Sequence, residues 1–265
     1  MTAAQEPLTV GGIFDRAVTI VVERWRVLLP LALLLGAVEA IVQAIIEARA
    51  NGWLIGAAEL ISTSVDVVLF TGIVAVVADF GGRCDLGSLV RLGLLRFWSA
   101  AGVVVLSCLA LIVVIFISFI PSSLLRYHES ELAGAAFIGG IGVALALCSF
   151  LTIYVSIAYV NVVLESMSPL GAIRASTHRV KSAGAGRALL LGAALVVLTF
   201  APAFLAALIP DRPPLLLACK QLVMFGVLTP IFVYPTVVQT VAAIDYRHRS
   251  LGTDIARIVE ARAQV

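Results

Sequence analysis

The chain has 265 residues, of which 61% are hydrophobic and only 13% are charged, and its mean hydropathy is +1.09. A soluble domain has roughly 25% charged residues, so this composition excludes an ordinary soluble protein and indicates a chain that crosses a membrane several times. The net charge is only +2, and the four cysteines lack the CxxC or Cys/His spacing of a zinc site.

The apolar segments predict the number of membrane spans. A span needs about 20 mainly apolar residues to cross a hydrocarbon core of roughly 30 Å. Six segments are long enough, near residues 27–48, 53–80, 98–120, 132–160, 188–208 and 215–245. No alternating barrel pattern is present, so the sequence predicts an all-α fold, a polytopic membrane bundle of six transmembrane helices.

Lysine and arginine residues predict the orientation of these spans. Of the 18 in the chain, 14 fall in the N-terminus, the second and fourth connections and the C-terminus, and three fall in the other connections. Cytoplasmic segments carry the excess of positive charge in membrane proteins. We therefore expect both termini on the cytoplasmic side of the cell (inner) membrane.

Amphipathic segments precede the first, third and fifth spans. In the first, apolar residues recur at helical spacing over 10–21, and charged residues, including Arg16, occupy the other side. In the second, Ser88 is a predicted N-cap, and Leu89 and Leu92 share a side with Arg91 nearby.

The third amphipathic segment has the clearest helix start. Ser168 is a predicted N-cap, and Pro169 occupies the favoured first helical position. The expected apolar stripe is Leu170, Ile173, Thr177 and Val180, and the expected basic stripe beside it is Arg174, His178 and Lys181.

Such helices lie in the headgroup plane, with apolar residues in the acyl chains and basic residues near anionic lipid phosphates. The candidate lipid-headgroup contacts are Arg16, Arg91, Arg174, His178 and Lys181. The chain then divides into three units of one interfacial helix and two spans, over 9–80, 86–160 and 168–246, with a cytoplasmic tail at 247–265, all in one membrane domain. The alternative is that any bundle with an even number of spans places alternate connections on one side.

A family resemblance centres on the third unit, "VVLESMSPLGAIRASTHRVKSAGAGRALLLGAAL". This segment resembles the glycerophosphoryl diester phosphodiesterase membrane-domain family and related bacterial membrane proteins. The positions that match the family pattern are Glu165, Pro169, Ala172, Arg174 and Ser176. Thr177 stands where the family often has an aromatic residue. The resemblance implies a membrane module without the catalytic barrel of the enzymes that gave the family its name.

Ionisable and amide residues within the predicted spans form a candidate intramembrane polar cleft, because such residues are costly in lipid and tend to face a cavity or a partner. They are Glu39, Gln43, Glu59, Asp66, Lys220 and Gln221. The cleft could hold a polar headgroup or move protons. The alternative is that these side chains form interhelical contacts and stabilise the bundle.

No phosphate loop, nucleophile elbow or HExxH motif occurs in the sequence. We therefore expect a non-enzymatic, lipid-interacting structural or accessory membrane protein without a cofactor or a bound metal. Its expected partners are anionic membrane lipids, with a homo-oligomer or a membrane protein partner as further possibilities and no nucleic acid. The alternatives are a transporter or lipid-handling protein that uses the cleft, and a membrane-embedded lipid phosphodiesterase.

Overall fold

The computed structural model describes residues 8–47, 51–78, 86–127, 132–207 and 229–263. Within these ranges every element of secondary structure is an α-helix, so the predicted all-α class is confirmed. The helices are α1 (Val10–Glu47), α2 (Gly52–Val77), α3 (Leu86–Tyr127), α4 (Ala133–Glu165), α5 (Pro169–Ala183), α6 (Ala185–Ala207) and α8 (Thr229–Ala263).

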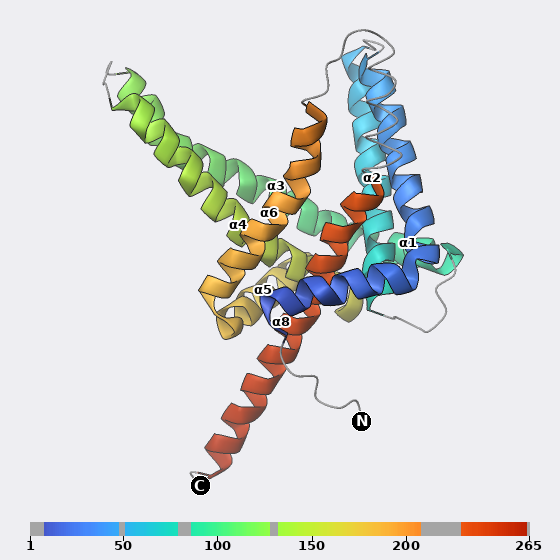
Figure 1. Cartoon of the computed structure of the whole chain (residues 1–265), viewed down its shortest axis with the longest axis vertical. Helices are drawn as coiled ribbons and strands as arrows, with labels where there is room; N and C mark the ends of the chain where they lie inside the picture. Colours follow the sequence, from blue (N-terminus) through green and yellow to red (C-terminus); the bar gives the residue numbers. More distant parts are fainter. Residues whose placement is uncertain (1–7, 48–50, 79–85, 128–131, 208–228, 264–265) are drawn as a thin grey trace.

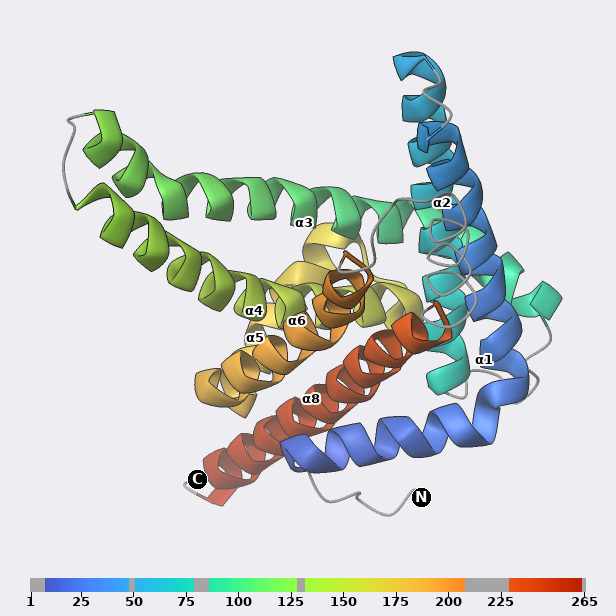
Figure 2. The ribbon, with the colours of Figure 1, turned by 45° about the horizontal axis from the view of Figure 1, so that its top comes forward.

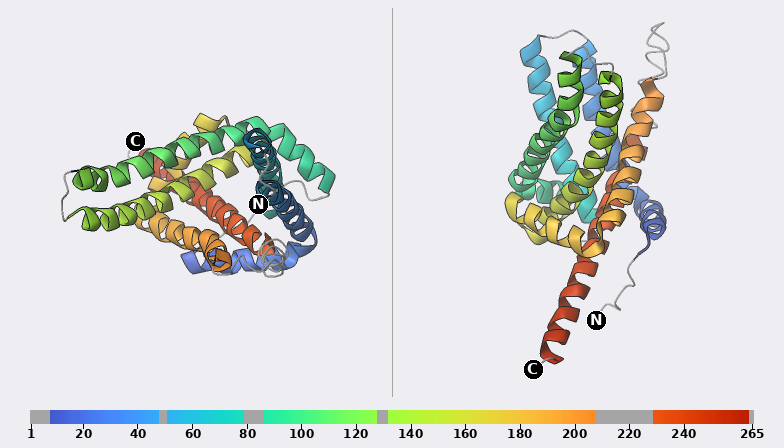
Figure 3. Two further views of the ribbon diagram at one scale, coloured as in Figure 1. Left: turned by 90° about the horizontal axis from the view of Figure 1, so that it is seen from above. Right: turned by 90° about the vertical axis from the view of Figure 1, so that its left-hand side faces the viewer.

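The helices form two hairpins that diverge from a common base (Figure 1). Helices α1 and α2 make one hairpin and α3 and α4 the other, while α6 and α8 lie between them. The short helix α5 lies at the base, where it packs against α4 and α8. The C-terminal part of α8 projects beyond the other helices (Figure 3).

In the part of the chain that the structure describes, four helices are long and apolar enough to cross a membrane: α1, α2, α3 and α4. The pair α5 and α6 would make a fifth span if its two bent halves are counted together. These lengths are consistent with a multi-pass membrane protein. The predicted sixth span, 215–245, lies partly outside the described residues, because the structure describes this region only from Thr229 onward.

The three predicted interfacial helices differ in how they join their spans. The first part of α1 runs across the base of the molecule and then turns to run beside α2, without a break in the helix (Figure 2). Helix α3 is likewise continuous from Leu86, so Ser88 lies inside the helix and its predicted role as N-cap is wrong. Only α5 is a separate helix, bent by 112° from α6.

Gly184 forms the corner between α5 and α6. Its φ is +95°, a conformation that L side chains rarely adopt and that glycine adopts freely. The N–H of Gly184 donates to the carbonyl of Val180 and so closes the last turn of α5. The residue type at this position therefore explains why α5 ends here, while α1 and α3 run on into their spans.

The buried core lies where the first half of α1, the end of α2 and the middle of α8 meet α4 and α6. Ile13, Leu31, Ile73, Ile157 and Leu191 are almost completely buried in it. Burying an aliphatic side chain of this size contributes roughly 1.5–3 kcal/mol when it leaves water. Between helices already in lipid that gain is small, and close packing becomes the main attraction.

Two glycines of the described chain allow particularly close helix contact. A Cβ atom on Gly140 would lie 2.5 Å from the carbonyl oxygen of Ser118, where α4 meets α3. A Cβ on Gly192 would lie 1.9 Å from the carbonyl oxygen of Ser149, where α6 meets α4. Real Cβ atoms do not approach so closely, so both helix pairs depend on the absence of a side chain at these positions.

Candidate functional site

The first candidate site is the exposed basic side of α5. The Oγ of Ser168 accepts a hydrogen bond from the N–H of Gly171 at 3.3 Å, and Pro169 begins the helix, so the predicted helix start is confirmed. Arg174, His178 and Lys181 are all exposed, on the side predicted to carry the basic stripe. The other two candidate headgroup contacts, Arg16 on α1 and Arg91 on α3, are exposed as well.

The buried side of α5 differs from the predicted apolar stripe. Ala172, Ser176 and Val180 are the buried residues, at a spacing of four, whereas Leu170 is 62% exposed. Small residues at the first two of these positions let α5 lie close against α4. The Oγ of Ser176 donates to the carbonyl of Ile173 within α5, so this hydroxyl is satisfied locally.

An ion-pair cluster holds α5 against the ends of α4 and α8. The guanidinium of Arg179 donates to both carboxylate oxygens of Glu165, at 2.8 and 3.0 Å, and also to the amide oxygen of Asn161. Arg247 of α8 lies 3.0 Å from the same carboxylate. Glu165, the last residue of α4, therefore connects three helices.

A second cluster is centred on Asp245, whose side chain is only 4% exposed. Its carboxylate accepts hydrogen bonds from Arg187 of α6 at 2.7 Å, from Arg249 at 2.8 Å and from the backbone N–H of Leu8 at 2.8 Å. Arg249 also donates to the carbonyl of Leu8 at 2.7 Å. The guanidinium carbon of Arg187 lies 5.7 Å from the centre of the Tyr246 ring. These contacts fix the start of α1 and the start of α6 to α8.

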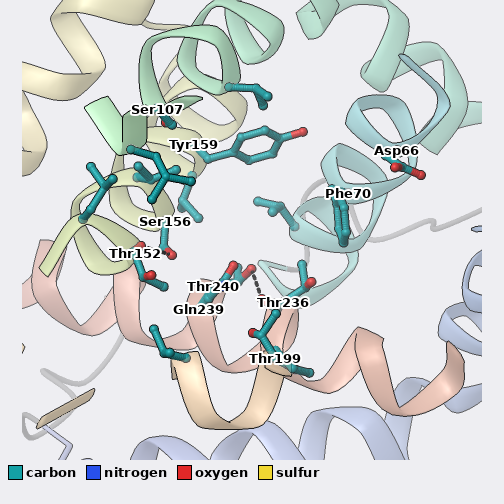
Figure 4. A pocket seen from close by; sticks show the side chains of 18 of the residues that line it. Asp66, Phe70, Ser107, Thr152, Ser156, Tyr159, Thr199, Thr236, Gln239 and Thr240 are labelled. Atoms are coloured by element: carbon teal, nitrogen blue, oxygen red, sulfur yellow. Dashed lines mark hydrogen bonds between the residues drawn. The ribbon is translucent and has the colours of Figure 1, made fainter. Parts of the chain in front are cut away.

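The second candidate site is a cavity of about 750 Å³ between the helices (Figure 4). Side chains from α1, α2, α3, α4, α6 and α8 line it. Aliphatic and aromatic side chains make up most of the wall, and its polar residues are Glu39, Asp66, Ser107, Thr152, Ser156, Tyr159, Thr199, Thr236, Gln239 and Thr240. Ligand pockets commonly have about this volume and this mixture of lining groups.

Two of the predicted cleft residues meet on this wall, Glu39 from α1 and Asp66 from α2. The Oγ of Ser62 donates to the carboxylate of Glu39 at 3.0 Å. The two carboxyl groups are close enough to interact with each other. The Oδ1 atom of Asp66 is buried and has no hydrogen-bond partner among the described residues.

Of the other predicted cleft residues, the structure describes the side chain of Glu59 alone. Glu59 is exposed on α2, and it is absent from the lining although it lies seven positions before Asp66. The side chain of Gln43 and both Lys220 and Gln221 lie outside the described residues. Sequence reasoning also missed the hydroxyl-bearing residues of α4 and α8. Thr152 and Ser156, and Thr236 and Thr240, recur at a spacing of four, which is a signal for one polar helix side within an apolar segment.

Within the described ranges, no group of three or more His, Cys, Asp or Glu side chains could hold a metal ion. The two candidate sites present charged and hydrogen-bonding side chains, exposed on α5 and enclosed in the cavity. Among known proteins, no family model, no curated sequence and no solved structure matches this chain.

Proposed function

We propose that this chain is a non-enzymatic integral inner-membrane protein with six spans and both termini in the cytoplasm, whose amphipathic helices bind anionic lipid headgroups. The observation that carries the proposal is the geometry of α5. One side of this helix is buried against the bundle, its basic side is exposed, and the helix turns by 112° away from the apolar helix that follows. In this role the protein supports a membrane process or a membrane complex.

The clusters at Glu165 and Asp245 support this role. The carboxylates of Glu165 and Asp245 pair with arginines at the base of the bundle, namely Arg179, Arg247, Arg187 and Arg249. Arg174 and Lys181 therefore face outward without competition from these carboxylates. A basic residue near an anionic membrane surface contributes about 1 kcal/mol to binding. The exposed residues of α5 are therefore the ones that select the lipid.

The test compares lipid binding by the full-length protein and by a variant with Arg174→Gln, His178→Gln and Lys181→Gln. Native mass spectrometry of the detergent-purified proteins counts bound phosphatidylglycerol against bound phosphatidylcholine. We expect the variant to bind phosphatidylglycerol about 25-fold more weakly, since two full charges at about 1 kcal/mol each are removed, while phosphatidylcholine binding stays the same.

The matched control removes the same net charge at Arg257→Gln and Arg262→Gln, near the far end of α8. This control keeps its preference for phosphatidylglycerol if the binding is local to α5. Equal loss in both variants would show a general charge effect, and no loss in the α5 variant would refute the proposal.

The six-span topology has its own test. Single cysteines at His178 and Arg126 are expected to face opposite sides of the membrane, because these residues lie in connections of opposite charge balance. A membrane-impermeant maleimide should label His178→Cys only from the cytoplasmic side and Arg126→Cys only from the other. Labelling of both from one side would contradict the topology.

The resemblance to the glycerophosphoryl diester phosphodiesterase membrane-domain family is part of the same proposal. It is supported by the turn in which Glu165 ends α4, Pro169 starts α5, and Ala172 and Ser176 are buried against the bundle. Arg174, the remaining matching position, is exposed on the lipid-binding side. The matching positions then serve the architecture of this turn rather than hydrolysis.

A second candidate function is that of a transporter or lipid-handling protein. The cavity in which Glu39 and Asp66 meet favours it, because its volume is that of a ligand pocket. Cys148 lines this cavity and is half-buried, so it reports on access. A variant that keeps Cys148 alone should react with a small water-soluble thiol reagent; an unreactive Cys148 would show a closed, dry interior and refute this function.

A further inference from the structure

The cavity has a one-sided chemistry, in which oxygen acceptors greatly outnumber hydrogen-bond donors. It is lined by two carboxyl groups, those of Glu39 and Asp66, and no lysine, arginine or histidine lines it among the described residues. The Oγ of Ser62 donates to Glu39, the two carboxyl groups interact with each other, and the Oδ1 atom of Asp66 is unsatisfied within the described chain. An unpaired carboxylate in apolar surroundings is costly, and a positive partner would relieve that cost.

The neutral polar groups of the wall add to this asymmetry. Five of the seven lining hydroxyl groups donate their hydrogen atom to a helix carbonyl: those of Ser107, Thr152, Ser156, Tyr159 and Thr240. A hydroxyl group has one hydrogen atom and two lone pairs, so each of these groups keeps only acceptor capacity for a ligand. Figure 4 shows these side chains around the cavity, with Asp66 at its α2 edge.

From these observations we propose that the cavity binds an organic cation, a protonated amine attached to an apolar body. The ammonium group contacts the carboxylates of Glu39 and Asp66 and donates its other hydrogen atoms to nearby hydroxyl oxygens. The apolar body lies against side chains such as Leu35, Phe70, Val104 and Leu151, which line the same space. This inference rests on the second candidate function, because it requires an accessible cavity, and it is independent of lipid binding by α5.

An amine fits the cavity better than a bare metal ion does. Two carboxyl groups from different helices offer too few strong ligands for a divalent cation, which takes six or more oxygen atoms in the case of calcium. Most of the wall is also apolar, and a small hydrated ion makes no use of it. An ammonium ion with an alkyl chain uses both parts of the wall.

The first test measures binding of three probes of equal length to the purified full-length protein: n-octylammonium, octanoate and 1-octanol. Binding is measured by isothermal titration calorimetry in one non-ionic detergent. The heat of probe insertion into the micelles is then the same for every variant and can be subtracted. We expect octylammonium to bind at least about tenfold more tightly than the other two, since close charge pairs removed from water contribute more than 1.4 kcal/mol.

Two variants and one matched control locate this binding. Asp66→Asn and Glu39→Gln should each weaken octylammonium binding at least about tenfold. Glu59→Gln removes the same charge from the exposed side of α2 and should leave the affinity unchanged. Equal affinity for octylammonium and octanoate, or equal affinity in Asp66→Asn and the wild type, would overturn the proposal.

A second readout uses unaltered carboxylates and so does not depend on the folding of those variants. In the protein that keeps Cys148 alone, octylammonium should slow labelling of Cys148 at least about tenfold, and octanoate should not. Reaction of Cys148 without protection by octylammonium would overturn the ligand class but leave the accessible cavity intact. Failure of Cys148 to react at all would overturn both the ligand and the transport function.

Discussion

The guanidinium of Arg179 forms an ion pair with the carboxylate of Glu165, in which one guanidinium nitrogen donates to both carboxylate oxygens at 2.8 and 3.0 Å. The two side chains are only 12% and 17% exposed, so water screens the pair weakly. The pair connects the end of α4 to the third turn of α5 across the 166–168 turn. It fixes the direction of α5, and thereby the direction in which the exposed basic residues of α5 point.

Replacement of Arg179 by glutamine should destabilise this connection. The variant leaves Glu165 with Arg247 alone and removes two charge-assisted hydrogen bonds, for an expected cost of about 2–3 kcal/mol. The measurement is thermal unfolding of the detergent-purified protein, followed by circular dichroism. Arg174→Gln removes the same charge from the exposed side of α5 and should change stability by less than about 0.5 kcal/mol. Equal effects in the two variants would contradict the role of the pair.

Replacement of Asp245 by asparagine should release the start of α1. The carboxylate is almost fully buried and pairs with Arg187 and Arg249, so its loss leaves positive charge without compensation, at a cost of about 3–5 kcal/mol. Amide hydrogen exchange should rise at residues 8–12, because the neutral amide oxygen of asparagine is a weaker acceptor for the N–H of Leu8 than the carboxylate is. Asp15→Asn, at an exposed position on α1, should leave that exchange unchanged. Slow exchange in both variants would refute the prediction.

Substitution of Gly192 by alanine should separate α6 from α4. The new Cβ atom would lie 1.9 Å from the carbonyl oxygen of Ser149, and relief of this overlap should cost about 1–3 kcal/mol. Gly142→Ala is the control, because a Cβ there meets no atom within 4 Å. That change should be neutral or stabilise α4 by up to about 1 kcal/mol, the difference in helix propensity. The melting temperatures of the two variants check the prediction. It fails if the Gly192→Ala variant has the same melting temperature as the wild type.

Substitution of Gly184 by alanine tests backbone strain apart from packing. A Cβ at Gly184 has open space around it, so the cost comes only from the positive φ and should be about 1–3 kcal/mol. Gly186→Ala also places a Cβ in open space but requires no strained backbone. Thermal unfolding should therefore separate the two variants, and equal melting temperatures would show that the corner does not need a glycine.

The sequence predicted the start of α5 because its signals are local. Ser168 and Pro169 act within one turn of the helix they begin, and tertiary contacts do not change that chemistry. The failure at Ser88 has the opposite cause. Gly87 precedes Ser88 but does not stop the helix, so α3 already includes Leu86 and Gly87 and the serine lies inside the first turn.

The side of α5 that packs against the bundle was not predicted, because hydrophobicity identifies a stripe suited to lipid and not the side suited to close helix packing. Leu170 is more apolar than Ala172 or Ser176, yet it is the small residues that face α4. Helices in contact within a membrane select residues by size, because lipid is as apolar as leucine. The pairing of Glu165 with Arg179 was out of reach for a related reason, since it depends on the direction in which α5 folds back.

The candidate cleft was predicted in part. Glu39 and Asp66 could be found because ionisable residues are rare in apolar segments, and the structure brings them together. Glu59 satisfied the same criterion but lies outside the cavity, since seven residues place it about 10 Å further along α2 and a shared helix side does not say how far a cavity extends. The contributions of α3, α4 and α8 to the wall required the packing of helices distant in sequence.

Helix α8 continues without interruption from Asp245 to Ala263. At 1.5 Å per residue, the part beyond Asp245 is about 27 Å of helix that projects from the bundle as a rod (Figure 3). Because the ion pairs of Asp245 anchor the base of this rod, they set the direction in which the rod leaves the bundle. A change at the Asp245 ion pairs would therefore swing the whole C-terminal rod relative to the bundle, because a continuous helix carries a rotation at its base along its full length.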